Sequence, residues 1–227
     1  MSFNGACRWR GAVAAMLLGV LLLTACGGGA SPPAQETADI RQLLATGQAA
    51  LDAGNLAAAE KHYRDAVAAN PQSAEAQFGL GNALVRQNKL AEAETAYKAA
   101  LNLDPGLSAA HANLGVVYYQ QYDLAAAARS FEAALRLKPD DPPTIYLMAA
   151  VRIQENNLVE AEKLLNQARD LDPRLAEVYY GLGVVYKLRG QKAEAIAAFE
   201  KFLDLGPGQD AAAADYARAE LRELRGE

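Results

Sequence analysis

Side chains able to perform acid–base, nucleophilic or metal chemistry are sparse in this sequence. The 227 residues include only two histidines, His62 and His111, and two cysteines. Asp140 and Asp141 form the one tight carboxylate pair, and their place before Pro142 is typical of a turn that caps the next helix. No nucleophile elbow, no zinc-binding His-Glu-x-x-His and no phosphate-binding Gly-Lys-Ser/Thr loop occurs. The inventory predicts no enzyme, no cofactor and no metal site.

Cys26 is the remaining candidate for covalent chemistry, because of the segment before it. Arg8 and Arg10 give a basic start, and residues 12–23 form an apolar run that is too short to span a bilayer and typical of a signal-peptide core. The run ends in Leu-Thr-Ala-Cys, which resembles the lipobox of bacterial lipoproteins. That resemblance implies a signal peptide over residues 1–25 and acylation of Cys26, for example with palmitate. The alternative is an ordinary secretory signal with an incidental cysteine.

The residues after Cys26 bear on where the protein resides. Gly27 stands where, in many didermal bacteria, an aspartate would favour the inner membrane. We therefore expect a lipid-anchored protein of the bacterial cell envelope that faces the periplasm, at the outer rather than the inner membrane. Residues 26–36 are rich in Gly and Pro, which predicts a flexible linker behind the anchor. Cys7 would leave with the signal peptide, so the mature chain would contain no disulfide.

The rest of the chain is organised by an internal repeat. Prolines recur at a constant step of 34 residues, and a period of this size indicates a stacked array of helical hairpins. Other columns keep the same step: one is all alanine, one is glycine with a single alanine, and one is a large apolar residue. The proline column is Pro71, Pro105, Pro139, Pro173 and Pro207. The others are Ala59, Ala93, Ala127, Ala161, Ala195; Gly47, Gly81, Gly115, Ala149, Gly183; and Tyr63, Tyr97, Phe131, Leu165, Phe199.

These columns resemble those of the tetratricopeptide repeat family. The resemblance implies an all-α, right-handed superhelical solenoid of about five helical hairpins with a C-terminal capping helix. The array would span residues 37–208, with repeats at about 40–73, 74–107, 108–141, 142–175 and 176–208, and the cap would follow at 209–227. Small residues would let paired helices approach, and the ring would fill the gap between one hairpin and the next. Since no hairpin can bury its apolar face alone, the repeats must stack.

Capping residues in the sequence predict where several of the helices begin. Asn55, Asp123 and Asn157 stand just before second helices, where a side-chain oxygen can accept a bond from a free backbone N–H. Phe202 interrupts a column of alanines, and we expect it to pack against the capping helix. The expected helices are Thr37–Ala53, Leu56–Ala69, Ser73–Gln87, Leu90–Leu103, Ser108–Gln121, Leu124–Leu137, Pro142–Glu155, Leu158–Leu171, Ala176–Arg189, Lys192–Leu205 and Gln209–Arg225.

In the tetratricopeptide repeat family the first helices of successive repeats line a concave face that binds peptides or a partner's helix. Asn82 and Asn113 match the two asparagines of the family's carboxylate clamp, but Phe78, Pro143 and Leu147 replace its basic residues. This departure argues against acidic C-terminal tails and favours an uncharged or apolar segment. For the tyrosines the alternative is a purely structural role in packing. The predicted partner-binding residues are Phe78, Asn82, Asn113, Val116, Tyr119, Tyr146, Leu147, Tyr180 and Val184.

Composition and architecture together predict a scaffold that binds a protein or peptide partner. The formal net charge of −5 and the lack of a basic cluster exclude a nucleic-acid binder, and we expect no small-molecule substrate. In overall plan the chain resembles tetratricopeptide lipoproteins that help assemble a pilus, a secretin or an exopolysaccharide machine. The alternative is a docking subunit that modulates cell-wall hydrolases or synthases.

Overall fold

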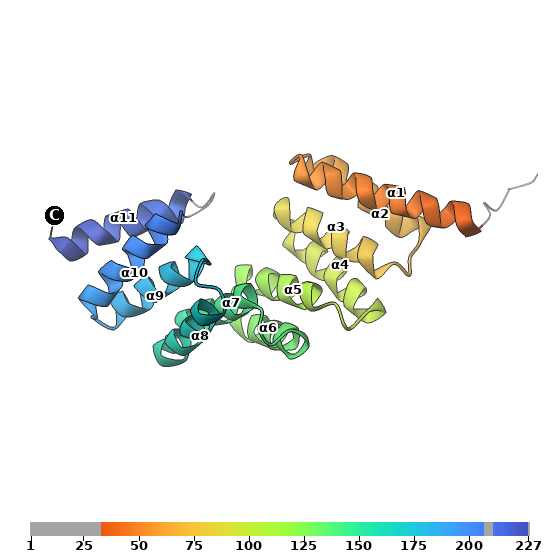
Figure 1. Ribbon diagram of the computed structural model, residues 1–227. Coiled ribbons are helices and arrows are strands. Elements are labelled where there is room, and N and C mark those ends of the chain that lie inside the picture. The colour runs from red at the N-terminus through yellow and green to blue at the C-terminus, as the bar shows by residue number, and fades with distance from the viewer. Residues whose placement is uncertain (1–32, 207–210, 227) are drawn as a thin grey trace, which may run out of the picture.

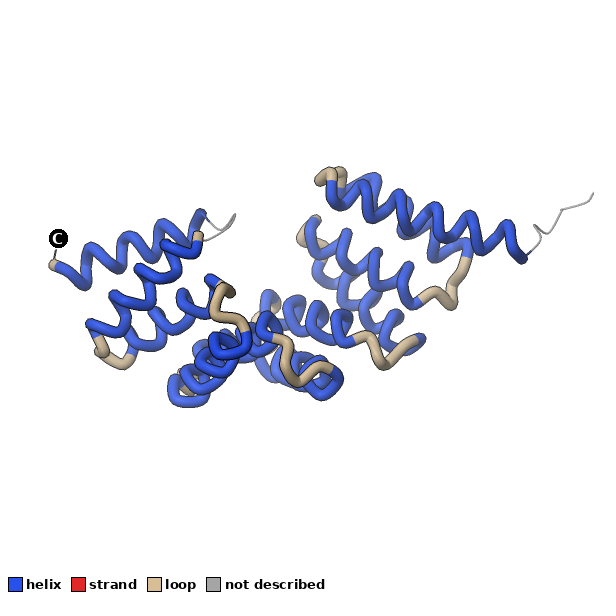
Figure 2. The backbone as a smooth tube through the Cα atoms, viewed as in Figure 1, coloured by secondary structure: helices blue, strands red, loops and turns tan. Residues whose placement is uncertain are grey.

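The computed structural model describes residues 33–206 and 211–226, and this part of the chain consists of helices joined by short turns and loops, without strands (Figures 1 and 2). The all-α prediction is confirmed. None of the described helices is both long and apolar enough to cross a membrane. The helices are α1 (Pro33–Asp52), α2 (Leu56–Ala69), α3 (Ala74–Arg86), α4 (Leu90–Leu103), α5 (Ser108–Gln120), α6 (Leu124–Leu137), α7 (Pro142–Gln154), α8 (Leu158–Leu171), α9 (Ala176–Leu188), α10 (Lys192–Leu205) and α11 (Ala211–Arg225).

The predicted boundaries differ from the observed ones mainly at the two ends. Helix α1 begins at Pro33, inside the segment expected to be a linker, because proline is well tolerated at the start of a helix. Helix α11 is described from Ala211 instead of Gln209. The predicted signal peptide, Cys26 and the first part of the linker lie outside the described residues.

The helices pair into hairpins that stack in chain order. Each odd-numbered helix packs on the even-numbered helix that follows it, and each even-numbered helix packs on the next odd-numbered one. The odd-numbered helices from α1 to α9 also contact one another in series. The array bends into an open arch with α1 and α11 at its two ends (Figure 1). The odd-numbered helices therefore form a continuous row, which we call the odd-helix face.

The spacing within each hairpin is set by a contact between a glycine and a ring. A Cβ added to Gly81 would lie 2.4 Å from the Tyr97 ring, and one added to Gly115 would lie 2.6 Å from Phe131. Both distances are shorter than van der Waals contact, so these rings occupy the space that a side chain would need. The fourth repeat has Ala149 in the glycine column, and there the partner is the smaller Leu165.

The same rings also reach the next hairpin, as the sequence predicted. A Cβ on Gly79 of α3 would lie 2.1 Å from the ring of Tyr63, which comes from α2 of the preceding repeat. A Cβ on Gly181 of α9 would similarly meet Leu165 of α8 at 2.8 Å. Tyr63 and Leu165 thus each contact two hairpins, and a glycine in the following hairpin makes room for them.

The predicted helix caps are confirmed. Asn55, Asp123 and Asn157 each accept a hydrogen bond from the backbone N–H three residues on. Asp141 caps α7 through the N–H of Thr144, at 3.1 Å, so this aspartate stabilises a helix end. The turn that closes each first helix contains a residue at positive φ, and these positions again keep the 34-residue step. They are Gly54, Asn88, Tyr122, Asn156 and Gly190.

The C-terminal helix α11 closes the array. Its Ala217 and Leu221 are buried with Phe202 of α10 in one cluster. The predicted contact of Phe202 with the capping helix is therefore confirmed. Lys187 of α9 forms an ion pair with Glu220 of α11, which adds a polar connection at the rim of this contact.

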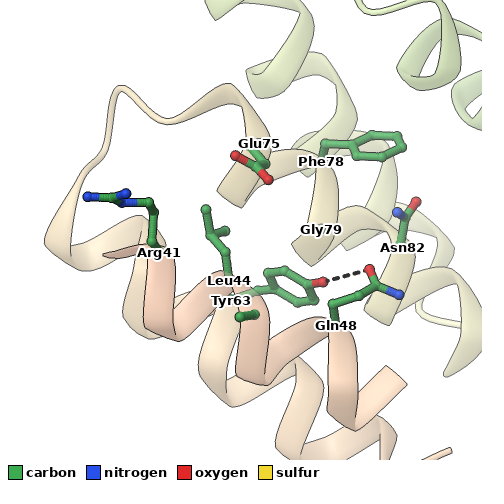
Figure 3. Close-up of a pocket in the computed structure, with 9 residues that line it drawn as sticks. Arg41, Leu44, Gln48, Tyr63, Glu75, Phe78, Gly79 and Asn82 are labelled. Carbon is green, nitrogen blue, oxygen red and sulfur yellow. Dashed lines mark hydrogen bonds between the residues drawn. The ribbon is translucent and has the colours of Figure 1, made fainter. Parts of the chain in front are cut away.

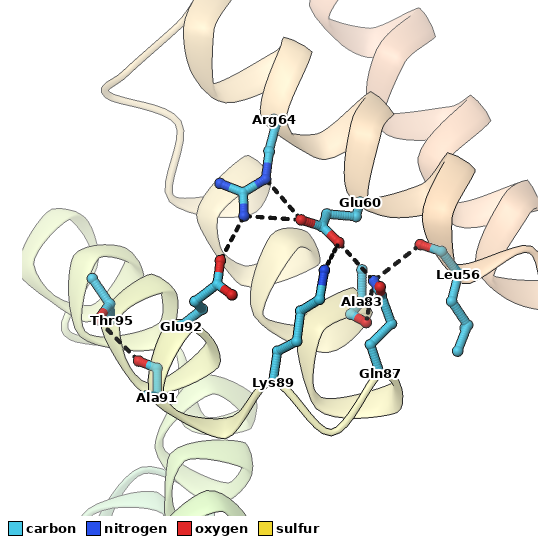
Figure 4. A network of polar contacts seen from close by, with 9 residues as sticks. All are labelled: Leu56, Glu60, Arg64, Ala83, Gln87, Lys89, Ala91, Glu92 and Thr95. Atoms are coloured by element: carbon cyan, nitrogen blue, oxygen red, sulfur yellow. Dashed lines mark hydrogen bonds and ion pairs between the residues drawn. The ribbon is translucent and has the colours of Figure 1, made fainter.

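A polar network joins α2 of the first repeat to the α3–α4 turn and α4 of the second repeat (Figure 4). Glu60 of α2 bonds Lys89 at 2.7 Å and Gln87 at 2.9 Å, both from the α3–α4 turn. Arg64 bonds Glu60 at 2.9 Å and Glu92 of α4 at 2.7 Å. The hydrogen bond from Lys89 is the main reason that the pKa of Glu60 is lowered from 4.5 to about 2; burial opposes this shift, and Gln87 and Arg64 add to it.

The network predicts acid sensitivity at the junction of repeats one and two. Because the folded-state pKa of Glu60 lies below its unfolded value, its carboxylate stabilises the fold above pH 4.5, and this contribution is lost as the pH falls toward 2. We expect about 1 kcal/mol, since Lys89 and Arg64 are 41% and 50% exposed. Urea unfolding of wild type and Glu60→Gln should show a stability difference that is constant above pH 5 and disappears near pH 2. A difference independent of pH would contradict the assignment.

Candidate functional site

All nine residues predicted to bind a partner lie on odd-numbered helices and are half-buried. Phe78 and Asn82 come from α3, whereas Asn113, Val116 and Tyr119 come from α5. Helix α7 provides two more and helix α9 the last two. The odd-helix face thus contains the complete predicted set, but the structure distributes it over several separate cavities.

A cavity of about 480 Å³ lies between α1 and α3 (Figure 3). The ring of Tyr63 lies beneath Gly79, with Phe78 and Asn82 on the α3 side. Because Gly79 has no side chain, the Tyr63 ring contributes to the cavity wall. The sequence analysis found Phe78 and Asn82 but missed the other polar lining residues, which are Arg41, Gln48 and Glu75.

The two predicted clamp asparagines are brought together, and they bond each other. Asn113 Nδ2 donates to Asn82 Oδ1 at 2.8 Å, and the buried Tyr97 hydroxyl donates to the same oxygen at 2.8 Å. Burial raises the pKa of Tyr97, so its hydroxyl stays protonated and keeps its role as a donor. Asn82 therefore accepts the hydrogen bond of a buried tyrosine hydroxyl, a structural role that the sequence analysis did not predict.

The pairing of the Tyr97 hydroxyl with an amide side chain is part of a pattern that recurs along the chain. In the first repeat Tyr63 donates to Gln48 Oε1 at 3.3 Å, at the same repeat position as Asn82. In the third and fifth repeats the ring is phenylalanine, and Val116 and Val184 take the place of the amide. An amide thus occurs where the ring has a hydroxyl, and an apolar residue occurs where it has none. This correspondence was the signal in the sequence that could have predicted the role of Asn82.

Asn82 and Asn113 also line a second cavity of about 240 Å³, which lies between α3 and α5. Within the described part of the chain, neither Asn82 Nδ2 nor Asn113 Oδ1 makes a further hydrogen bond. One donor and one acceptor therefore remain for the backbone of an extended peptide. Arg86 also lines this cavity, and its guanidinium donates to Leu51 O at the end of α1, at 2.6 Å.

The middle of the odd-helix face is apolar. Val116, Tyr119 and Leu147 rest on the cluster that contains Phe131. Tyr119 also lines a separate cavity of about 300 Å³ together with Tyr122, whose side chain is 82% exposed. The structure therefore does not bring Tyr119 into the same cavity as the asparagines.

The last predicted residues lie near the C-terminal end of the face. Tyr146 of α7 and Tyr180 of α9 line a cavity of about 320 Å³, which the cap helix α11 completes. Val184 packs beside it on the cluster that contains Phe199. Glu177 and Tyr216 also line this cavity, and the sequence analysis assigned no role to Glu177.

Neither histidine lines the cavities described above. His111 Nε2 lies 3.2 Å from the carbonyl oxygen of Pro105, and Tyr179, two repeats later, donates to Pro173 O at 3.0 Å in the same way. His62 is half-buried on α2, on the other side of the hairpin from the odd-helix face. Across residues 33–206 and 211–226, no three His, Cys, Asp or Glu side chains gather as metal ligands.

Comparisons with known proteins agree on the repeat. Tetratricopeptide repeat models match residues 44–108, 81–142, 118–185 and 176–209. No curated protein sequence matches the chain.

Among solved structures, PilF of Pseudomonas aeruginosa is similar with a TM-score of 0.71 and 18% identity, over 84% of this chain and 90% of that one. The MamA protein has a TM-score of 0.64 and 20% identity, over 74% and 92%. YrrB, described as a TPR protein with an unusual peptide-binding site, has a TM-score of 0.61 and 21% identity, over 81% and 97%.

The amide–phenol pattern predicts a compensating pair of substitutions. Asn82→Val removes the acceptor for the Tyr97 hydroxyl and for Asn113, and it should destabilise the fold by about 1–3 kcal/mol, as expected for unsatisfied buried polar groups. Adding Tyr97→Phe recreates the Val116–Phe131 pair of the next repeat and should recover much of the loss. Thermal and urea unfolding would measure both. A double variant no more stable than Asn82→Val would show that the pairing is incidental.

Proposed function

The chain belongs to the tetratricopeptide repeat family, and we propose that it is an envelope scaffold that binds an extended segment of a protein partner along its odd-helix face. The observation that carries this proposal is the row of half-buried amides and rings on odd-numbered helices, which line cavities at three helix junctions. Peptide binding by the structurally similar YrrB supports the proposal by analogy.

Two kinds of contact support a peptide ligand on this face. Asn82 and Asn113 offer a donor and an acceptor that suit a peptide backbone without reading its sequence. Phe78 and Tyr146 provide ring area beside cavities, and buried aromatic residues commonly dominate binding energy at protein contacts. These contacts hold a segment in place and perform no reaction, so the proposed role is binding rather than catalysis.

Anchoring at the membrane is the second part of the proposal. Leu23–Cys26 has the pattern of a lipidation site, and a lipid on Cys26 would hold the helical body at the membrane on the periplasmic side. One acyl chain gives only marginal membrane binding, so stable anchoring requires several chains. From that position the protein would assist the assembly of an envelope complex such as a pilus, a secretin or an exopolysaccharide machine.

The binding proposal predicts which face captures the partner. Phe78→Ala together with Tyr146→Ala should weaken binding of a captured partner by more than about 2 kcal/mol, the scale of interface hot spots. Val159→Ala is the matched control, because Val159 is an apolar residue of α8 that is 71% exposed. Photo-crosslinking from position 78 would capture the partner, calorimetry would measure the affinity, and thermal unfolding would show that the fold persists.

Two outcomes of that experiment are informative beyond affinity. A partner whose binding survives the loss of both rings but is weakened by Val159→Ala would move the site to the even-numbered helices. The identity of the captured protein separates an assembly factor from a docking subunit for cell-wall hydrolases or synthases.

The anchoring proposal predicts the effect of a single atom change. Cys26→Ser should abolish incorporation of a labelled fatty acid and leave the protein unprocessed or soluble in the periplasm. Cys7→Ser is the control and should be processed normally, since Cys7 lies within the predicted signal peptide. Metabolic labelling and membrane fractionation measure both. Normal labelling of Cys26→Ser would contradict the lipoprotein assignment.

A further inference from the structure

The cavity at the C-terminal end of the odd-helix face combines aromatic rings with one carboxylate. It encloses about 320 Å³, and α7, α9, α10 and α11 all contribute to its lining. The lining residues that matter here are Tyr146, Glu177, Tyr180, Phe202 and Tyr216. A volume of this size suits one long side chain of a partner.

The rings are held in fixed relative positions. The centroid of the Tyr180 ring lies 5.3 Å from that of Phe202 and 5.9 Å from that of Tyr216, and both pairs are steeply tilted. Phe202 is 2% exposed and anchors the group in the core, whereas Tyr216 is 40% exposed and faces solvent. The faces of aromatic rings are electronegative, so an organised group of rings attracts a cation that lies over one of its faces.

A cation already approaches this group of rings from its outer side. Lys187 Nζ lies 6.0 Å from the centroid of the Tyr216 ring while it pairs with Glu220. The positive charge of Lys187 is therefore already paired with a carboxylate of α11. The position of Lys187 shows that the edge of the group accommodates a positive group within the protein itself.

Glu177 gives the cavity a net negative charge. It lies in the first turn of α9, and no hydrogen bond or ion pair joins its carboxylate to another described residue. Glu75, at the same repeat position on α3, lines the α1–α3 cavity, but Arg41 lines that cavity too. No lysine or arginine lines the cavity around Glu177 among the described residues.

We propose that this cavity binds the cationic side chain of an arginine or lysine in the partner's extended segment. The carboxylate of Glu177 would pair with the cation, while the rings of Tyr180 and Tyr216 would contact its charged group and its apolar stem. The inference rests on the proposed function, and it adds one charged anchor to the uncharged segment expected from the sequence. It also agrees with the replacement of the clamp's basic residues, which argues against an acidic tail.

A simpler role for Glu177 is to stabilise the N-terminus of α9 through the helix dipole. Glu75 has that same position on α3, so the two roles can be separated by comparing the residues. If both carboxylates only stabilise their helices, substituting either Glu75 or Glu177 would lower the stability of the fold. Neither substitution would then change which ligand the protein prefers.

The test uses two peptide probes that differ in charge alone. Both are seven-residue alanine–serine peptides with blocked ends, one with a central arginine and the other with citrulline, its uncharged isostere. NMR titration of the full-length protein in detergent would give the affinity for each. We expect wild type to prefer the arginine peptide by about five-fold, the size of a cation–π contact plus an exposed ion pair.

Three variants complete the experiment. Glu177→Gln should reduce the preference to the part that the rings supply, without changing the affinity for the citrulline peptide, and Glu75→Gln should leave the full preference intact. Tyr216→Leu should reduce it, with the shifted resonances confined to α9 and α11. Equal binding of the two peptides by wild type, an undiminished preference in Glu177→Gln, or no binding of either peptide at millimolar concentration would each overturn the inference. None of these results would affect crosslinking from position 78, which tests the proposed function separately.

Discussion

The contact between a glycine of one helix and a ring of the next is the constraint on which this structure depends. In four of the five repeats the glycine column leaves a space that Tyr63, Tyr97, Phe131 or Phe199 occupies. The fourth repeat has Ala149 and Leu165 in these two columns, and both are buried in one cluster. Total volume at this contact is thus nearly conserved along the chain, as close packing requires. Because residues of this column also touch the following hairpin, the same side chain determines both the spacing of the two helices in its own hairpin and the packing of the next hairpin on it.

The chemistry of the odd-helix face follows from the same contact. A tyrosine in the ring column has a hydroxyl that must be satisfied, and Gln48 and Asn82 provide the acceptors. A phenylalanine needs none, and valines take those positions in later repeats. The face is therefore rich in amides near α1 and α3, whereas the cavity at its C-terminal end is lined by aromatic rings. A ligand that follows it would meet polar backbone contacts first and an aromatic cavity last.

Much of the fold could be predicted from the sequence because its signals are local and periodic. The 34-residue columns, the caps at Asn55, Asp123 and Asn157, and the packing of Phe202 on the last helix all follow from spacing and capping chemistry. The site was harder to predict, since its residues meet across helices in a register that periodicity alone does not give. Asn82 was recognised by its position, but its bond to Tyr97 was not foreseen. Glu177 has an ordinary place in a first turn, and only the surrounding rings distinguish it.

The most direct test of the glycine–ring constraint is a double-mutant cycle in the third repeat, measured as free energies of unfolding in urea. Gly115→Ala alone should cost about 1–3 kcal/mol, because the added Cβ meets Phe131. Phe131→Leu should make room for that Cβ, as Leu165 does beside Ala149 in the fourth repeat. The account predicts that the double variant is at least about 1 kcal/mol more stable than the sum of the single effects implies. Effects that add to within about 0.5 kcal/mol would contradict it.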